Sequence, residues 1–297
     1  MLALLNKRVL LFFFLVLFLP AQSVVNASNI RALLFEAQQG GSYVPADVTE
    51  LEKAESLFLS IFRGDDMQLL KTEWSAVGFD LLEIRENETN YIVVQEKAGR
   101  KEGRGFYLFR GNTNSISVFQ APHSFKDLRT GEIAFDLIVQ SDYAAAAWNT
   151  VPRRYLVNNE TVNADLAHLQ YTFIIAFTRA FAQHFVQGNV LQIHGYAQSK
   201  RTTAEGKQSE FIISSGTALP TNTLIETTQC LKQKVSDNTK VYPQEVKELG
   251  GTANTIGAAL RELGHKGFMH IEISREVRER LLKETNLQNN FDYCLPN

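Results

Sequence analysis

Two histidines and two carboxylates lie at or near the ends of apolar segments, and residues of these types could bind a metal ion together. His123 follows one apolar segment, and Asp127 comes four residues later. His194 ends a second segment. A catalytic zinc takes three nitrogen or oxygen ligands from the protein and leaves one position for water. We therefore predict that His123, Asp127 and His194 bind Zn2+, although a hydrogen-bonded structural imidazole remains the alternative for each histidine taken singly.

The fourth residue, Glu272, lies inside the apolar run 268–273, which is predicted to be a buried strand. A buried carboxylate is costly unless it is paired or functional. Zinc lowers the pKa of bound water and polarises a carbonyl oxygen, but a carboxylate that is not a ligand is still needed to move protons. Glu272 is therefore predicted to be the general base and acid of a zinc hydrolase.

Other titratable residues have more ordinary interpretations. Glu132 could replace Asp127 as a ligand, but its place at the start of a predicted helix favours an interaction with the helix dipole. His168 falls within the predicted helix 164–187, where a hydrogen-bonded histidine is expected. Three further histidines are expected to be structural: His184, His265 and His270. Because side chains alternate along a strand, His270 should share a face with Glu272.

The elements that position these residues begin with two helices, 46–62 and 66–76, which are followed by four short segments rich in β-branched and aromatic residues. Short connectors predict that these four strands form an antiparallel meander: 79–84, 91–95, 105–109 and 115–120.

Beyond residue 123 the pattern alternates between helices and strands. The predicted helices are 130–142, 164–187, 221–234 and 255–263, and the predicted strands are 144–149, 190–194, 211–214, 239–242 and 267–273. Helical connections imply crossovers between parallel strands. The predicted fold class is therefore α/β, with a mixed, mainly parallel sheet flanked by helices. In such folds sites gather at the carboxyl ends of strands, which is where His123 and His194 lie.

The N-terminus predicts export. Lys7 and Arg8 precede an apolar run of about 11 residues, which is shorter than the roughly 20 that a membrane-spanning helix needs. A small-residue cleavage pattern follows at 25–27, so residues 1–27 read as a signal peptide, with an uncleaved anchor as the alternative. The expected compartment is periplasmic or extracellular, with no stable membrane insertion after cleavage. Residues 28–78 are predicted to be a helical extension and residues 79–297 a catalytic domain.

The net charge limits the class of binding partner, and the cysteine content limits the possible disulfides. Removing Lys7 and Arg8 leaves 28 basic residues of the original 30 against 32 acidic ones, a net charge of about −4. This mild acidity argues against a nucleic-acid partner. Cys230 and Cys294 could pair in an oxidising compartment or remain as two free thiols.

Several short motifs of the chain resemble those of a known group of enzymes. The run 123–134, His-Ser-Phe-Lys-Asp-Leu-Arg-Thr-Gly-Glu-Ile-Ala, looks like the metal motif of the phage-type poly-γ-glutamate hydrolases. Arg-Arg-Tyr at 153–155, Gln-Ile-His-Gly at 192–195 and Ile-Glu-Ile-Ser-Arg at 271–275 follow in a similar order. N-formylglutamate amidohydrolases are similar over the same elements, and both belong to the zinc-carboxypeptidase-like group. The resemblance covers roughly residues 105–282.

The resemblance implies the same zinc ligands and the same role for Glu272, and it leaves a role in the site open for His168. It also implies that Arg153 or Arg154 holds a substrate carboxylate, for which a guanidinium fork is well suited. The sequence departs from the hydrolases in two ways. Ser-Phe-Lys follows His123 where they carry glycines, and the acidic ligand, Asp127, is Asp rather than Glu and comes one residue earlier.

The expected function is therefore an exported zinc-dependent amidohydrolase, carboxypeptidase-like in fold. Its substrate would be a small-molecule or peptide-like acid, cleaved at an amide bond next to a glutamate-like carboxylate. Two alternatives stay open. One is a secreted binding protein that has kept the fold but not the metal, and the other is an amidase acting on peptidoglycan.

Overall fold

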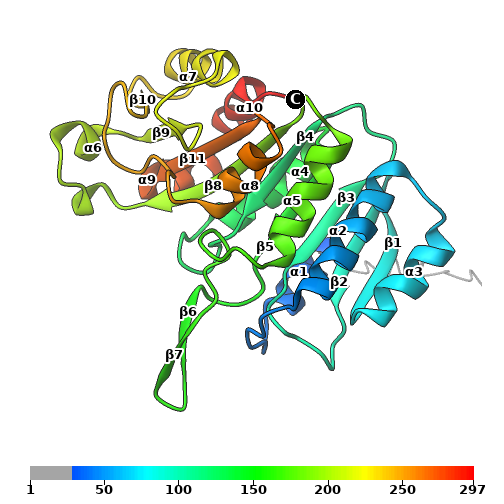
Figure 1. Ribbon diagram of the computed structural model, residues 1–297. Helices are drawn as coiled ribbons and strands as arrows, with labels where there is room; N and C mark the ends of the chain where they lie inside the picture. Colours follow the sequence, from blue (N-terminus) through cyan, green and yellow to red (C-terminus); the bar gives the residue numbers. More distant parts are fainter. Residues whose placement is uncertain (1–28) are drawn as a thin grey trace, which may run out of the picture.

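The computed structural model describes residues 29–297, so the predicted signal peptide lies outside the described residues. Within this part of the chain, nine strands form one mixed sheet with helices on both faces (Figure 1). The strands are β1 (Phe79–Glu86), β2 (Thr89–Glu96), β3 (Phe106–Arg110), β4 (Ser117–Ala121), β5 (Ala145–Trp148), β8 (Asn189–Tyr196), β9 (Phe211–Ser214), β10 (Thr239–Val241) and β11 (Phe268–Ser274). Their order in the sheet is β1-β2-β3-β5-β4-β8-β11-β9-β10. The predicted mixed α/β class is confirmed.

The sheet has a parallel centre and antiparallel pairs toward its sides. Strands β5, β4, β8 and β11 are parallel neighbours, whereas β1 to β3 form an antiparallel meander and β9 runs antiparallel to β11. The prediction of a four-stranded meander was wrong in its last strand, because β3 pairs with β5 and β4 lies between β5 and β8. Strand β4 is buried along its whole length, and strands buried on both faces belong at the centre of a sheet.

The helices divide into two layers. Those on one face are α2 (Val48–Arg63), α3 (Met67–Ala76), α5 (Phe173–His184) and α8 (Thr255–Glu262). Those on the other face are α1 (Asn29–Ala37), α4 (Thr130–Gln140), α7 (Asn222–Lys234), α9 (Arg275–Leu281) and α10 (Thr285–Cys294). Figure 1 shows α2 and α5 lying across the near side of the sheet. A 3-10 turn (Gln198–Lys200) and the short α6 (Ala204–Gln208) follow β8.

Local sequence signals account for both ends of helix α2, whereas helix α1 was not predicted. Asp47 caps α2 by accepting a hydrogen bond from the Glu50 backbone, and the Glu50 side chain bonds back to the Asp47 backbone. Gly64 ends the helix in the left-handed conformation that glycine adopts without strain. Both boundaries agree with the prediction. Helix α2 packs on α5, so it shares a hydrophobic core with the sheet.

Side-chain alternation sets the chemistry of the face that α5 covers. Apolar residues of the central strands pack there, namely Val118, Val190 and Phe268. Their polar counterparts at the same parity lie further along the same strands: Gln120, Gln192, His194, His270 and Glu272. The opposite parity supplies the second core, with Phe119, Leu191, Met269 and Ile271. The sheet therefore changes from apolar to polar on this face toward the carboxyl ends of the parallel strands.

The segment between β5 and β8 differs most from the prediction. The expected helix 164–187 begins only at Phe173, and residues 164–172 form a loop. A two-stranded hairpin that was not predicted precedes this loop, formed by β6 (Arg154–Val157) and β7 (Glu160–Asn163), and it projects away from the sheet (Figure 1). His168 therefore lies in a loop rather than in a helix.

A disulfide bond joins two helices of the C-terminal half. Cys230 in α7 and Cys294 at the end of α10 form a disulfide, which decides between the two alternatives for the cysteines. Among residues 29–297, no helix has both the length and the apolar character needed to cross a membrane.

Candidate metal centre

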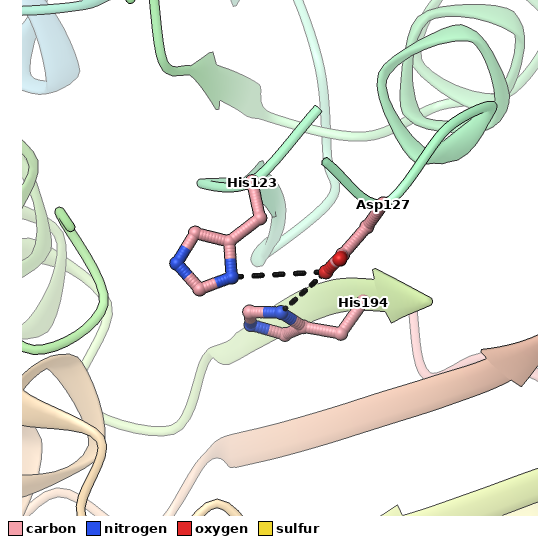
Figure 2. A group of neighbouring side chains, drawn as sticks. All are labelled: His123, Asp127 and His194. Carbon is pink, nitrogen blue, oxygen red and sulfur yellow. Dashed lines mark hydrogen bonds and ion pairs between the residues drawn. The ribbon is translucent and has the colours of Figure 1, made fainter. Parts of the chain in front are cut away.

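The three predicted ligands meet at the carboxyl end of the parallel strands (Figure 2). His123 lies in the turn after β4, and the Asp127 backbone N–H donates to the His123 carbonyl at 2.8 Å, which curls the turn so that both side chains reach the same place. His194 comes from β8. Asp127 Oδ2 lies 3.2 Å from His194 Nδ1 and 3.7 Å from His123 Nδ1. All three side chains have little exposed surface.

The outward nitrogen of His123 is held by a carboxylate that the sequence did not reveal. His123 Nε2 donates to Asp165 Oδ1 at 2.7 Å, and His168 Nδ1 donates to the same oxygen at 2.9 Å. Burial opposes ionisation of Asp165, but the hydrogen bonds with His123 and His168 outweigh it and hold the pKa of Asp165 well below its usual range. An ionised Asp165 keeps a proton on His123 Nε2, so Nδ1 is the nitrogen that presents an electron pair to Asp127 when the ring is neutral.

His194 has the same arrangement, with an amide in place of the carboxylate. His194 Nε2 lies 2.8 Å from Gln192 Oε1, and because an amide oxygen can only accept, Nε2 carries the hydrogen. Burial lowers the pKa of His194, so the ring is neutral and the electron pair on its Nδ1 faces Asp127.

These contacts show that the residues fit a metal ion. Burial opposes ionisation of Asp127, but its interactions with the nearby His123 and His194 imidazoles outweigh burial and hold the pKa of this carboxyl far below its usual range, so it contributes negative charge. When His123 and His194 are both neutral, the electron pairs of their Nδ1 atoms and of Asp127 Oδ2 point at one another over short distances and repel unless a cation lies between them. Histidine nitrogen and carboxylate oxygen are zinc ligands, and each ligating histidine in a zinc site bonds through its other nitrogen to a polar partner, as both do here.

Strand β11 adds two buried polar groups next to this cluster. Glu272 is the register partner of His194, and His270 is the register partner of Gln192. His270 and Glu272 share a face, as predicted, and His270 Nε2 lies 3.9 Å from Glu272 Oε1. Burial, together with the charge of Asp127, raises the pKa of Glu272 to about 8. Glu272 Oε2 and His270 Nδ1 are buried and have no hydrogen-bond partner within the described residues, so both remain available to a ligand.

A cavity of about 630 Å³ opens over these groups, which is within the size range of small-molecule sites. Six basic residues line it: Lys126, Arg153, Lys200, Arg201, Arg275 and Arg278. Only three acidic residues do so: Asp127, Glu272 and Glu279. The cavity is therefore positively charged outside the candidate metal centre and suits an anionic ligand.

The two candidate arginines are placed differently. Arg153 lines the cavity, and its Nη1 lies 3.5 Å from His123 Nδ1. Arg154 lies on the exposed strand β6 and does not line the cavity. Glu132, the alternative ligand, forms an ion pair with Arg129 at the surface and is not part of the site.

Sequence reasoning missed Asp165 and misplaced His168 because it extended a helix over both. A usable signal was present in Thr172, a residue type that favours helix N-caps, directly before the apolar segment that begins at Phe173. A helix begun there leaves Asp165 and His168 in a loop beside the ends of the parallel strands.

Comparisons with known proteins give a distant likeness. No family model matches the chain, and no curated protein matches it. A candidate metallopeptidase from Shewanella amazonensis SB2B aligns with a TM-score of 0.35 and 10% identity, over 80% of this chain and 94% of that one. A second candidate metallopeptidase, from Shewanella denitrificans OS217, aligns with a TM-score of 0.36 and 10% identity, over 78% and 92%. At this level of similarity, the two structures carry no argument about the site.

Proposed function

We propose that the protein is an exported zinc-dependent hydrolase that cleaves an amide bond next to a glutamate-like carboxylate. The observation that carries this proposal is the convergence of His123 Nδ1, His194 Nδ1 and Asp127 Oδ2, with the other nitrogen of each histidine already engaged. These three residues would hold the zinc ion. When bound, zinc supplies a Lewis acid for the carbonyl and lowers the pKa of water.

Glu272 is proposed to move the proton. Its carboxyl lies beside the three ligands, and a raised pKa, about 8 in the protein without metal, is typical of a group that both takes and returns protons near neutral pH. The unpartnered Oε2 can accept a proton from the attacking water as its oxygen bonds to the carbonyl carbon. The same proton then passes to the amide nitrogen as the carbon–nitrogen bond breaks.

Substrate orientation is assigned to Arg153. About a third of its side chain is exposed, and it reaches the cavity next to His123. A guanidinium fork binds a carboxylate with two parallel hydrogen bonds, which fixes the direction of the substrate as well as its position. The excess of basic over acidic lining residues supports an acidic small molecule or peptide as the substrate. Arg154, outside the cavity, has no part in this proposal.

Export is the remaining part of the proposal. It rests on the signal-peptide pattern at residues 1–27, and the disulfide between Cys230 and Cys294 supports it, because disulfides persist in oxidising compartments.

The test is to purify the mature protein, dialyse it against zinc, remove excess metal and measure both bound zinc and hydrolysis. The substrate panel contains N-acyl-glutamates, γ-glutamyl peptides and cell-wall fragments. We expect about one zinc per chain and turnover of the first two classes. Turnover confined to cell-wall fragments would identify a peptidoglycan amidase. A protein that takes up no zinc would be a binding protein of the same fold, and the proposal would be wrong.

A further inference from the structure

Two fully buried glutamines lie directly beneath the candidate metal centre. Gln120 on β4 and Gln192 on β8 are register partners, and neither has any exposed surface. Burying an amide without hydrogen-bond partners is costly, so buried glutamines are found where their hydrogen bonds are satisfied. The bonds of these two residues form one continuous chain with a fixed direction.

The first anchor of the chain is helix α5. Thr178 donates its hydroxyl hydrogen to the Ile174 carbonyl at 2.7 Å, so its oxygen is left as an acceptor. Gln120 Nε2 donates to that oxygen at 2.8 Å. The carbonyl oxygen of the Gln120 side chain is thereby turned toward Gln192, whose Nε2 donates to it at 3.1 Å.

The second anchor is the start of helix α8. Asn254 caps this helix, since its Oδ1 accepts from the backbone N–H groups of Ile256 at 3.0 Å and Gly257 at 3.3 Å. The amide nitrogen of Asn254 must therefore point the other way, and it donates to Gln192 Oε1. Helices α5 and α8 thus orient Gln192 independently, and both turn its oxygen toward His194 Nε2.

This orientation decides which nitrogen of His194 carries the hydrogen. With the hydrogen on Nδ1, the ring would donate to Asp127 Oδ2, 3.2 Å away, and that bond would occupy two of the three metal-binding atoms. It would also leave the Nε2 electron pair facing Gln192 Oε1 at 2.8 Å. The fixed amide chain penalises that tautomer and favours the one in which Nδ1 is free.

We propose that Gln192 is a positioning residue that keeps the hydrogen of His194 on Nε2, so that Nδ1 and Asp127 remain free to bind a metal. Gln120, Thr178 and Asn254 hold Gln192 in the required orientation. The use of the site by zinc rests on the proposed function, whereas the tautomer is a property of the protein without metal. The two ideas can therefore fail separately.

The experiment compares Gln192→Met with Gln192→Glu. Methionine has nearly the shape of glutamine but offers no strong acceptor, and glutamate restores an acceptor while placing a carboxylate in a buried position. Two quantities are measured on each variant: the tautomer of His194 in the metal-free protein, from the nitrogen shifts of its labelled imidazole, and the zinc affinity, from competition with a chelator.

For Gln192→Met we expect the hydrogen to move to Nδ1 and the zinc affinity to fall by roughly 10- to 100-fold, the usual effect of removing a partner of a ligating histidine. For Gln192→Glu we expect the wild-type tautomer and an affinity near that of the wild type. If Gln192 served only in packing, Gln192→Glu would lose more zinc affinity than Gln192→Met, because a buried carboxylate would disturb the fold more than methionine does.

Gln120→Met serves as the matched control, because it removes one anchor but leaves Asn254 in place. Gln120→Met should lower the zinc affinity less than Gln192→Met does. The inference is overturned if Gln192→Met leaves the tautomer unchanged, or if Gln192→Glu loses as much affinity as Gln192→Met does. If the tautomer responds as expected but the wild type binds no zinc, the positioning role stands and the proposed function fails.

Discussion

His194 and Glu272 are register partners on the adjacent parallel strands β8 and β11, with their side chains on the same face of the sheet. A proposed metal ligand and the proposed general base are therefore neighbours, although they lie far apart in the sequence. Both belong to strands at the centre of the sheet, where packing from two sides limits their movement. Sites built on strands hold their geometry more closely than sites built on loops.

Glu272→Gln should retain zinc but lose turnover by about 10²- to 10⁴-fold, since the amide keeps the shape of the side chain and cannot accept the proton. Metal content and kcat are measured on the same preparation. Glu132→Gln, outside the site, is the control and should change neither quantity appreciably. Loss of zinc in Glu272→Gln would mean that Glu272 is a ligand rather than the base.

Asp165→Ala should weaken zinc binding by roughly 10- to 100-fold, because His123 loses the carboxylate that fixes its Nε2 hydrogen. Asp165→Asn should weaken zinc binding less than Asp165→Ala does. Both His123 and His168 bond to the same oxygen of Asp165, and an amide oxygen can still accept from them. Chelator competition measures both affinities. Equal affinities for the wild type and Asp165→Ala would exclude the supporting role of Asp165.

Arg153→Lys should raise KM for carboxylate-bearing substrates by about tenfold or more, because lysine cannot form the two parallel hydrogen bonds of a guanidinium fork. Arg154→Lys, the neighbouring residue on the exposed strand β6, should leave KM unchanged. Steady-state kinetics of the two variants decide the assignment. It is wrong if the two substitutions have equal effects.

Zinc affinity should rise with pH. Burial opposes a proton on His123, but the nearby carboxylates of Asp127 and Asp165 outweigh it and raise the pKa of His123 in the metal-free protein. Below that pKa zinc must displace a proton, so each unit of falling pH should weaken binding by up to about tenfold, and the dependence should level off above it. Apparent dissociation constants measured across neutral pH test this, and an affinity that does not change with pH would contradict it.

The double variant Cys230→Ser with Cys294→Ser should have a free energy of unfolding about 2–4 kcal/mol lower than that of the wild type. The reason is that the disulfide joins residues 64 positions apart and restricts the unfolded chain. Zinc content and turnover below the melting temperature should remain, because Cys294 packs in the core on the face of the sheet away from α5. Thermal unfolding with and without a reductant provides the measurement. An oxidised wild type that is no more stable than the double variant would show that the bond does not stabilise the fold.

The sequence by itself determined the local features of this protein. The capping residue Asp47 and the terminating Gly64 set the ends of α2 through contacts within a few residues. Strand-like segments ending near His123 and His194 were enough to suggest a shared site, because parallel strands bring their carboxyl ends to one edge. Alternation along a strand was enough to place His270 on the face of Glu272.

The tertiary structure decided what depends on partners distant in the chain. The position of β4 between β5 and β8 follows from burial on both faces, which no local pattern distinguishes from the end of a meander. Asp165 became part of the site because residues 164–172 fold as a loop against His123. The hydrogen on His194 is fixed by Gln192 through contacts that reach α5 and α8, and only the pairing of β4 with β8 brings those amides together. Hydrogen-bond direction passes from one side chain to the next in space, so it could not be obtained from the order of residues along the chain.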